Sequence, residues 1–394
     1  MRIRFFNTFE PVSPFYRDLI PSLVEQGHQI EILISSTEYR KGRELLEEIL
    51  DFENVRIRRM PSGIKLANSS IKKIWVVTTY IVTAAMATLF GRSADLNFFL
   101  TQPPLFQVWG RVLRRLRGQP FMCLVMDLYP DVAISAGSLK PNSFLAKCMK
   151  RISRSTLNRA KNVVVIGRCM RDFLEQEGVS ADRIVLIRNW VNEHEIQRIE
   201  LAENRLRKEL GFGDKFVCLY SGNMGVSHRF DEWLEAIRLL RDENIEFVFV
   251  GGGSRKSEID QFCEQHQLTK VHMLPYQATQ RLSESMGIGD IHFVCLRNDF
   301  VGKVVPSKAY GALAAGKPII YQGDSKGEIA QMVRKFELGF VVEEGDAAGL
   351  VATIRKCHRD PNGLSQWSLN AYQASQNEFS RETALASYRQ LFSD

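Results

Sequence analysis

Short apolar runs that alternate with helix-like segments constrain the fold of this chain more than any other feature. In the first half, strand-like runs occupy residues 3–6, 30–35, 55–58, 96–100, 121–126, 162–166 and 184–187. Helical patterns lie between them, near 14–27, 71–90, 104–117, 141–160 and 168–177. Because strands that alternate with helices build βαβ units, the pattern predicts an α/β fold with a mainly parallel, doubly wound sheet.

The same alternation restarts after a charged stretch at 193–213. The second set of strand-like runs is 216–220, 247–251, 271–274, 291–296, 318–321 and 339–342. A chain of 394 residues is long enough for two domains with separate cores. We therefore expect two Rossmann-like domains, 1–188 and 189–372, that face each other across a cleft, and an amphipathic helical segment, 373–394, that crosses back to the first domain. Ligands of such sheets bind beyond the carboxyl ends of the strands.

Composition restricts the partners and the compartment. A net charge of +7 and a pI near 9.0 favour contact with phosphorylated substrates, anionic lipid headgroups or nucleic acid. No arginine-rich arm or aromatic-basic RNA motif is present, which argues against nucleic acid. The seven cysteines are far apart without a CxxC pair, which is typical of reduced thiols in the cytoplasm, and the scattered histidines predict no metal site.

The chain has one long apolar segment. Residues 74–90 read IWVVTTYIVTAAMATLF and follow Lys72 and Lys73. The segment is short for a membrane span, so two interpretations stay open: a helix packed on a sheet, or a helix that lies in the plane of a membrane surface. At the other end of the domain, Met1 leads directly into RIRFF, which indicates a first strand rather than a secretory leader.

Residues 304–320, VVPSKAYGALAAGKPII, combine a cationic turn with a helix of small residues. Pro306 suits a first helical turn, so Ser307 and Lys308 lie where free backbone N–H groups collect and attract anions. Gly316 and Pro318 end the helix before a short buried strand. An ordinary loop–helix–strand connection is the alternative interpretation.

A second candidate anion loop follows the first strand of the second domain. In SGNMGVSHRFDEWLEAI, Gly222 and Gly225 permit a tight turn, and a helix begins near Asp231. Three side chains add hydrogen-bond donors, namely Asn223, His228 and Arg229. The loop therefore fits a phosphate, although it could also be a purely structural connection.

The glycine run at 251–253 invites a dinucleotide-binding interpretation. A GxGxxG fingerprint from Gly251 requires glycine at position 256, where the chain has Lys256. The run also follows the second strand of its domain rather than the first. A nucleotide-cofactor oxidoreductase is therefore disfavoured.

Polar loops also follow two strands of the first domain. TQPP begins at Thr101, and MDLYPD ends at Asp131. Asp127 and Asp131 are candidate acid or base groups, whereas Asp131 could instead fix a turn or cap a helix. No Ser-His-Asp order, P-loop or paired-glutamate pattern is present.

Seven motifs follow one another along almost the whole chain, namely TQPPLFQVWGRVLRRLRGQPF, MDLYPDVAISAGSLKP, RAKNVVVIGRCMRDFLEQEGV, YSGNMG, FVFVGGG, HMLPY and VVPSKAYGALAAGKPII. With these motifs in this order, the chain resembles the family 4 retaining glycosyltransferases, which have the GT-B fold. The resemblance is strongest to the subgroup that extends polyprenyl-linked saccharides for surface polysaccharides.

The resemblance implies roles for individual residues. The donor diphosphate is expected at the loop from Gly222 to Gly225 and at the N–H groups of Ser307 and Lys308, and the base is expected beside Gly251 and the 274–276 turn. The implied donor-binding residues are Gly222, Asn223, Gly225, His228, Arg229, Gly251, Leu274, Tyr276, Pro306, Ser307 and Lys308. Asp127 and Lys303 are the implied catalytic residues, and Thr101, Pro103 and Asp131 the implied acceptor-binding residues.

The chain departs from the family at three places. Many members have two glutamates where this chain has Lys303 and Gly311, and a cleft histidine where it has Met126. The glycine-rich acceptor loop after the first strand is replaced by FNTFEPVSP. These departures leave open a weak or altered enzyme.

The resemblance implies retaining sugar transfer from a nucleotide sugar, most simply UDP-linked, to a polyprenyl-diphosphate-linked acceptor, without a metal or other cofactor. It also implies peripheral contact with the inner membrane face through 65–92 and 111–117, including Lys65 and Arg111. The alternative is a non-catalytic two-lobed protein that binds an acidic small molecule.

Overall fold

The computed structural model describes residues 1–8, 14–36, 52–61, 70–192 and 194–393. The chain folds into two units, Met1–Ile187 together with Leu385–Asp394, and Arg188–Ala384. Lys65 and part of the FNTFEPVSP segment lie outside the described residues.

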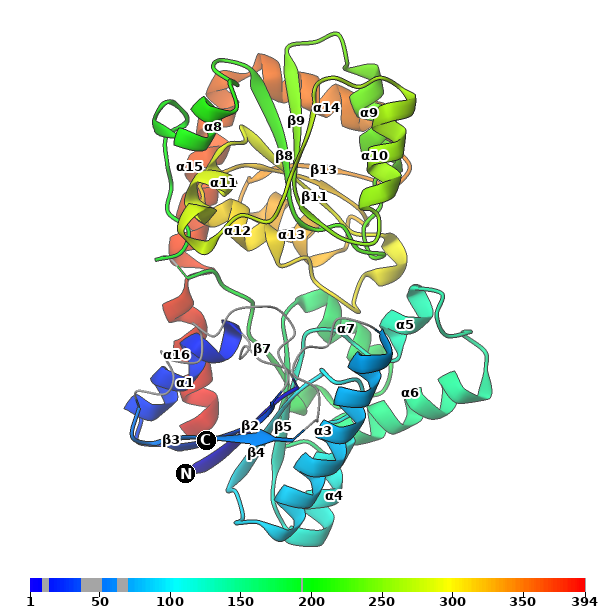
Figure 1. Ribbon diagram of the computed structural model, residues 1–394, viewed down its shortest axis with the longest axis vertical. Coiled ribbons are helices and arrows are strands. Elements are labelled where there is room, and N and C mark those ends of the chain that lie inside the picture. Colours follow the sequence, from blue (N-terminus) through cyan, green and yellow to red (C-terminus); the bar gives the residue numbers. More distant parts are fainter. Residues whose placement is uncertain (9–13, 37–51, 62–69, 193, 394) are drawn as a thin grey trace. The chain divides into compact units, whose positions relative to one another are not determined.

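The first unit contains a parallel seven-stranded sheet in the order β3-β2-β1-β4-β5-β6-β7 (Figure 1). Its strands are β1 (Arg2–Asn7), β2 (Gln29–Ser35), β3 (Val55–Met60), β4 (Leu96–Leu100), β5 (Phe121–Val125), β6 (Val163–Val165) and β7 (Ile184–Leu186). Its helices are α1 (Pro14–Glu25), α3 (Ser70–Phe90), α4 (Val108–Arg117), α5 (Asp131–Ser135), α6 (Phe144–Leu157) and α7 (Arg168–Gln176). The 3₁₀ turn Ala181–Arg183 precedes β7.

Side chains of successive strand residues enter opposite layers of this unit. On one face, Phe5 and Phe98 pack against Phe392 of α16 (Arg381–Ser393), with ring centroids 6.5 and 5.6 Å apart. On the other face, Phe6 stacks on Phe99 at 4.3 Å. Because strand side chains alternate, one apolar run supplies both cores.

The second unit contains a parallel six-stranded sheet in the order β10-β9-β8-β11-β12-β13 (Figure 1). Its strands are β8 (Phe216–Asn223), β9 (Ile245–Gly252), β10 (Val271–Leu274), β11 (Ile291–Cys295), β12 (Ile319–Gln322) and β13 (Gly339–Val342). Its α-helices are α8 (Arg205–Glu209), α9 (Asp231–Leu239), α10 (Lys256–Gln265), α11 (Leu282–Gly287), α12 (Lys308–Ala314), α13 (Glu328–Lys335), α14 (Ala347–Arg359) and α15 (Pro361–Asn377). Its 3₁₀ turns are Leu201–Glu203, Thr279–Arg281 and Asn298–Phe300.

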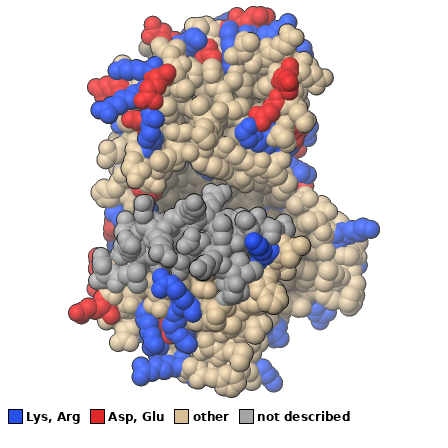
Figure 2. All heavy atoms as spheres, viewed as in Figure 1, with Lys and Arg blue, Asp and Glu red and all other residues tan. Residues whose placement is uncertain are grey.

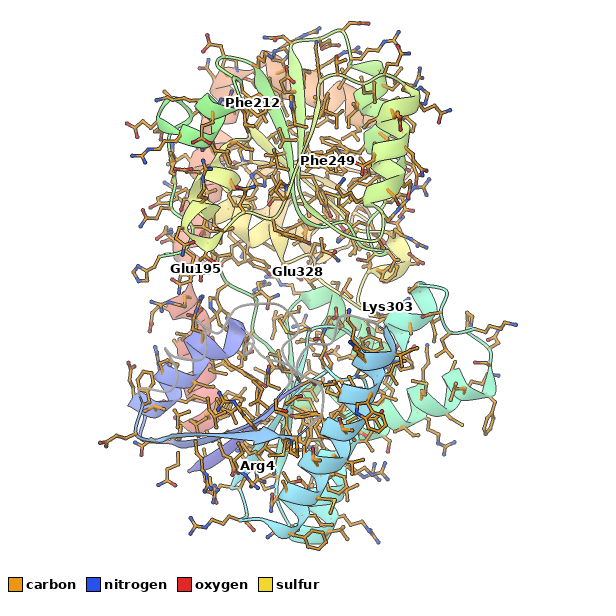
Figure 3. The ribbon with its side chains drawn as sticks, in the orientation of Figure 1. Arg4, Glu195, Phe212, Phe249, Lys303 and Glu328 are labelled. Atoms are coloured by element: carbon orange, nitrogen blue, oxygen red, sulfur yellow. The ribbon has the colours of Figure 1, made fainter. Side chains whose placement is uncertain are left out.

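The core of the second unit is aromatic. Trp233 of α9 stacks on Phe293 of β11 at 3.9 Å, and Phe249 of β9 is fully buried among its neighbours (Figure 3). These contacts hold the sheet rigid. The loops at the carboxyl ends of β8, β9 and β11 therefore start from fixed positions.

The doubly wound α/β architecture predicted from the alternation is confirmed, and every expected strand is present with small shifts of its ends. The short helices α5 and α8 were not expected. The proposed division at residue 372 falls inside α15, which extends to Asn377 before α16 begins.

Helix α3 exposes most of its apolar surface. Among the described residues, the stretch Ile71–Phe90 is long and apolar enough, by length and composition, to cross a membrane, and only 22% of its apolar window is buried. The surface over α3 is mainly tan in Figure 2, with basic side chains near its margins. Exposed fractions are 57% for Trp75, 52% for Val82, 56% for Met86 and 79% for Phe90.

Candidate active site

Lys308 is the central cation at the carboxyl edge of the second sheet. Its Nζ donates hydrogen bonds to the hydroxyl of Tyr220, a residue in the second half of β8, and to Nε2 of His228, at 3.1 Å. The ammonium also lies 4.1 Å from the centre of the Tyr220 ring. Lys308 forms no ion pair within the described part of the chain, so its charge is balanced only by neutral dipoles and a ring face.

The protonation state of His228 follows from its contacts. His228 Nδ1 lies 2.8 Å from the Cys295 carbonyl oxygen, which can only accept a hydrogen bond. The proton is therefore on Nδ1, and Nε2 accepts from Lys308. Burial, and then the charge of Lys308, lower the pKa of His228 to about 3. The imidazole is neutral at physiological pH and holds the lysine in place.

Burial also lowers the pKa of Lys308 to about 8, with a smaller opposing effect from Cys295. The ammonium is still mainly protonated at pH 7. A positive charge that is desolvated and unpaired by a carboxylate favours a bound anion, because an anion supplies the missing counter-charge.

Glycine brings the backbone close to this lysine. A Cβ on Gly222, whose φ is +134°, would lie 3.5 Å from Lys308 Cε. A Cβ on Gly251, at φ +126°, would lie 2.3 Å from the Gly222 carbonyl oxygen. Only glycine allows the ends of β8 and β9 to approach this closely.

The 274–276 turn borders the same edge. Leu274 ends β10 beside β9, and the Tyr276 hydroxyl donates to the Gly252 carbonyl oxygen at 3.3 Å. The Tyr276 ring is 48% exposed next to Gly251 and Gly252. The loop therefore offers a flat aromatic surface next to backbone polar groups, which suits a nucleobase.

Ser307 and Lys308 occupy the start of α12, as the sequence predicted. Pro306 is buried and Ser307 is exposed. Ser307 has helical backbone angles and makes no side-chain cap. The first amide–carbonyl bonds at this end are Ala309 N to Pro306 O and Tyr310 N to Ser307 O. The amides before Ala309 are therefore available to a ligand.

Arg229, in the loop that follows β8, and Asn223, at the end of that strand, contact other groups of the protein. The Arg229 guanidinium lies 2.9 Å from Asp231, 2.9 Å from Glu232 and 3.1 Å from Glu344. Three carboxylates neutralise it, so this geometry argues against its predicted phosphate contact. Asn223 is exposed, and its carbonyl oxygen accepts from Tyr220. Gly225 is half-buried in the same turn.

Lys303 lies in the loop before α12 (Figure 3). Its Nζ donates to the Asp299 carbonyl oxygen at 2.6 Å. The side chain thus closes its own loop. Gly311 stands where many family members have the second glutamate. A Cβ at this position would lie 3.0 Å from Met286 Cε, in apolar surroundings.

The carboxyl edge of the first sheet carries a carboxylate, Asp127, that forms no ion pair with another described residue. Asp127 follows β5, and its Oδ2 accepts from Gln102 Nε2 at 3.5 Å. The buried Thr101 hydroxyl, after β4, accepts from the Asp127 amide at 3.3 Å. Burial raises the pKa of Asp127, with a smaller opposing effect from Gln102. Pro103 is buried next to Gln102, and Met126 is half-buried.

Asp131 has a structural role in this unit. It lies in the first turn of α5 and is 1% exposed. Its carboxylate lies 2.6 Å from Arg154 Nη2 and 2.9 Å from Lys150 Nζ. These two cations fix α5 against α6. The acceptor-binding role predicted for Asp131 is therefore not supported, and the alternative, a residue that fixes a turn or helix start, fits the geometry.

Sequence reasoning missed Tyr220 and Gln102. Tyr220 ends the run FVCLY, which was interpreted only as a buried strand, and Gln102 was noted only as part of TQPP. A tyrosine at the carboxyl end of a strand, just before a glycine turn, was the available signal for a polar group at the site. Among the described residues, no cluster of three or more His, Cys, Asp or Glu side chains could hold a metal ion.

Comparison with known families decides the assignment. Residues 12–190 match the glycosyl transferase 4-like domain, and residues 202–374 match glycosyl transferases group 1. The chain belongs to the family 4 glycosyltransferases. The family resemblance predicted from the seven motifs is thereby confirmed, and the enzyme class is glycosyltransferase.

Similar proteins agree with this family 4 assignment. WcaI of Escherichia coli (strain K12), assigned as a colanic acid biosynthesis glycosyl transferase, is 25% identical over 358 residues, which is 88% of each chain. Sucrose-phosphate synthase from Thermosynechococcus elongatus has a similar structure, with a TM-score of 0.79, 17% identity and coverage of 100% of this chain and 99% of the other. Anabaena Alr3699/HepE in complex with UDP and glucose gives a TM-score of 0.75 at 15% identity, with coverage of 100% and 99%. These structures establish the GT-B fold for this glycosyltransferase.

Proposed function

We propose that this glycosyltransferase moves a sugar from a UDP-linked donor, with retention, to a polyprenyl-diphosphate-linked saccharide during surface polysaccharide synthesis. The observation that carries the proposal is the Lys308 ammonium, which is half-buried at the carboxyl edge of the second sheet and has no carboxylate partner among the described residues. Similarity to a protein whose structure holds UDP and glucose supports a UDP-linked donor, and similarity to WcaI supports polysaccharide synthesis. The transferred group is a hexosyl or N-acetylhexosaminyl residue.

Lys308 and the free amides at the start of α12 stabilise the charge that grows on the departing diphosphate. Fixed donors aimed at developing negative charge are an effective form of catalysis in a desolvated site. Tyr220 and His228 position the lysine without neutralising it. Lys303 supplies a second cation from the same loop, and the proposal includes no metal or other cofactor.

Asp127 orients the acceptor in the first unit, with Thr101 and Pro103 at the border of its loop. With its pKa raised by burial, Asp127 can hold a sugar or acceptor hydroxyl through a hydrogen bond. Retention follows if the acceptor attacks the face from which the diphosphate departs. The leaving phosphate then takes the hydroxyl proton.

The membrane contact is proposed at 65–92 and 111–117, on the cytoplasmic face. Within this surface, α3 exposes Trp75, Val82 and Met86, and the hydroxyls of its threonines bond to carbonyls of their own helix. Such internal bonding lowers the cost of apolar surroundings for a hydroxyl. Extraction of the native protein by high salt or alkali supports a peripheral contact, whereas release by detergent alone contradicts it.

Transfer and binding can be measured separately. Thermal-shift screening against nucleotide sugars identifies the donor, because a ligand of the folded state raises its apparent stability. Incubation of the donor with a membrane lipid extract then tests transfer. We expect stabilisation by a UDP-sugar and a labelled lipid product; no stabilisation by any nucleotide sugar contradicts the proposal.

A non-catalytic binding protein is the second candidate. The replacement of the family's two glutamates by Lys303 and Gly311, and of its histidine by Met126, favours it. Stabilisation by a nucleotide sugar without hydrolysis or transfer, in the presence of the lipid extract, would support this candidate.

A further inference from the structure

A hollow between α4 and α6 of the first unit is lined almost entirely by arginine. Its volume is about 630 Å³, and its lining residues are Arg111, Arg114, Arg115, Asn158, Arg159 and Arg183. No acidic residue is among them. We call these six residues the arginine hollow.

The described contacts of the hollow leave its charge uncompensated. Arg111 donates to the Ser155 hydroxyl at 3.2 Å, Arg183 donates to the Ala160 carbonyl at 2.7 Å, and Arg114 donates to the Arg159 carbonyl. Arg159 donates to Ser155. None of the five arginines forms an ion pair with another described residue. Asp182, beside Arg183, does not line the hollow; its pKa is lowered first by the hydrogen bond from Ser180 and to a smaller extent by the charge of Arg183.

A second hollow of the molecule provides an internal comparison. It has a volume of about 620 Å³ and contains Arg229, Arg255 and Arg297. Its lining also contains Asp231, Asp299 and Glu344, and each of the three arginines pairs with a carboxylate. In this second hollow, the positive charge of the arginines is thus balanced by carboxylates. The arginine hollow differs because, among the described residues, no carboxylate lines it and none forms an ion pair with its arginines.

The arginine hollow lies away from the candidate active site of its own unit. Arg183 directly precedes β7, Arg159 follows α6 on the way to β6, and Arg114 is in the last turn of α4 before β5. All three positions are at the amino ends of strands, whereas Asp127 lies beyond a carboxyl end. An anion in this hollow is therefore neither the donor nor the acceptor phosphate.

We propose that the arginine hollow binds the phosphoryl headgroup of an anionic membrane lipid. Planar guanidinium groups match phosphate oxygens through paired hydrogen bonds. The choice of a lipid, rather than free phosphate, deepens the membrane contact proposed above and rests on it.

The connection between α4 and α3 favours the lipid. Arg117 of α4 donates to the Thr88 and Gly91 carbonyls at 2.7 and 2.8 Å, at the last turn of α3. Two exposed apolar side chains lie at these helix ends, Phe90 at 79% and Leu116 at 62%. Apolar side chains next to uncompensated arginines are suited to a lipid surface.

The length of α3 fits a contact in the membrane plane. The 21-residue helix is about 30 Å long and runs antiparallel to the strands of its sheet. A helix that lies flat on the bilayer has one end near the carboxyl edge, where the acceptor is proposed, and its other end near α4 and the arginine hollow. Both edges then contact the same surface.

Vesicle co-sedimentation tests the proposal with the full chain. The vesicles are phosphatidylcholine alone or phosphatidylcholine with phosphatidylglycerol. We compare the wild type with Arg114→Gln/Arg115→Gln/Arg159→Gln and with a control, Lys147→Gln/Arg151→Gln/Lys161→Gln, which removes equal charge from the first unit outside the hollow. We expect the hollow variant to lose on the order of tenfold or more in affinity for the anionic vesicles, and the control about threefold or less.

Equal losses in the two triple variants overturn the proposal, because they indicate diffuse attraction instead of a site. Arg115→Glu is a second variant, since the structure records no hydrogen bond or ion pair for Arg115 that its loss would break. It should lower anionic-vesicle binding while the melting temperature stays unchanged. Unchanged vesicle binding in this variant also overturns the proposal.

Inorganic phosphate and pyrophosphate distinguish the source of the anion. Millimolar phosphate could stabilise the wild type but not the hollow variant, while vesicle binding is the same in both. That result assigns the hollow to a free anion and overturns the proposal of a lipid headgroup. Stabilisation by UDP is measured in every variant. If UDP does not stabilise the wild type, the donor site at Lys308 is contradicted. The vesicle result then still tests, independently, whether the arginine hollow binds lipid.

Discussion

Lys308 combines a stability cost with a proposed function. Burial disfavours its ammonium, so replacement by a neutral side chain removes that cost. We expect Lys308→Met to raise the free energy of unfolding of the unliganded protein at pH 7 by on the order of 1–2 kcal/mol, while affinity for UDP falls tenfold or more. Urea unfolding and UDP titration calorimetry measure the two effects.

Lys317 provides the matched control for this substitution. Lys317 is buried beyond the opposite end of α12, and burial lowers its pKa to about 8, as it does for the half-buried Lys308. Lys317→Met should stabilise the protein similarly and leave UDP affinity unchanged. Equal loss of UDP affinity in both variants would show that the effect is not specific to the carboxyl edge of the sheet.

The affinity for UDP should depend on pH through Lys308. Its pKa is about 8 when folded and 10.5 ordinarily, so the unfolded chain binds more protons between these values. Stability therefore rises with pH across that interval, since the cost of the buried charge is complete below about pH 8 and then disappears. Donor affinity changes in the opposite direction, and we expect a loss of about tenfold between pH 7 and pH 9.

Lys308→Met is the baseline for this measurement, because it retains the titration of the nucleotide but lacks the ammonium. His228 contributes nothing in this range, since its pKa is lowered to about 3. A pH profile that is the same in the wild type and in Lys308→Met would exclude the lysine as the titrating group.

Asp127 should affect transfer without affecting the donor. Asp127→Asn keeps the hydrogen-bonding shape beside Gln102 and removes the carboxylate charge. We expect kcat for transfer to lipid extract to fall on the order of a hundredfold, with UDP affinity unchanged, because the residue belongs to the other unit. An unchanged kcat would remove Asp127 from the reaction.

At the scale of elements, the β8 and β9 ends depend on glycine. In Gly251→Ala, the new methyl group would lie 2.3 Å from the Gly222 carbonyl oxygen. We expect a loss of roughly 2–4 kcal/mol of stability and a weaker donor site, because backbone must shift to relieve the clash. Thermal denaturation with and without UDP measures both effects.

Gly213→Ala is the control for the glycine prediction. Gly213 also has a positive φ, of +49°, but no atom lies within 4 Å of its missing Cβ. Its substitution should cost about 1 kcal/mol, from the left-handed conformation alone. A similar cost at both positions would contradict the close approach of β8 and β9.

The elements themselves were largely predictable from the sequence. Apolar runs buried on both faces identify parallel strands without knowledge of the partners. Pro306 on one side and Gly316 and Pro318 on the other enclose α12, which runs from Lys308 to Ala314. The sequence did not predict the short helices α5 and α8, because they have too few turns to show a helical repeat of apolar residues. The boundary expected at residue 372 falls inside a helix, because α15 continues to Asn377 without a helix-breaking residue.

Side-chain pairing was much less predictable than the elements. The sequence placed Arg229 and Asp131 at suitable edges, but long-range partners decided their roles: Glu344 lies against Arg229, and Arg154 against Asp131. The buried Arg4, held by Glu31 at 2.7 Å, likewise depends on a neighbouring strand (Figure 3). Ion pairs between distant residues leave no local pattern in a sequence.

At the scale of the whole molecule, the first unit is completed by the last residues of the chain. Phe392 of α16 is 1% exposed and packs against Phe5 and Phe98, and Tyr388 contacts Phe15 at 5.4 Å. Gln26 of the first unit also bonds to Arg389 and Ser393. The core of the first sheet therefore forms fully only after synthesis of the second unit.

We expect Phe392→Ala to destabilise the first unit by roughly 3–5 kcal/mol, because it leaves a cavity against two strands. Leu369→Ala is the control, since Leu369 of α15 is 41% exposed and its loss should cost less than about 1 kcal/mol. Urea unfolding followed by hydrogen exchange of β1 and β4 amides measures the effect where the cavity lies. If Phe392→Ala leaves the exchange of these strands unchanged, α16 covers the sheet without stabilising it, and the early strands fold independently of the end of the chain.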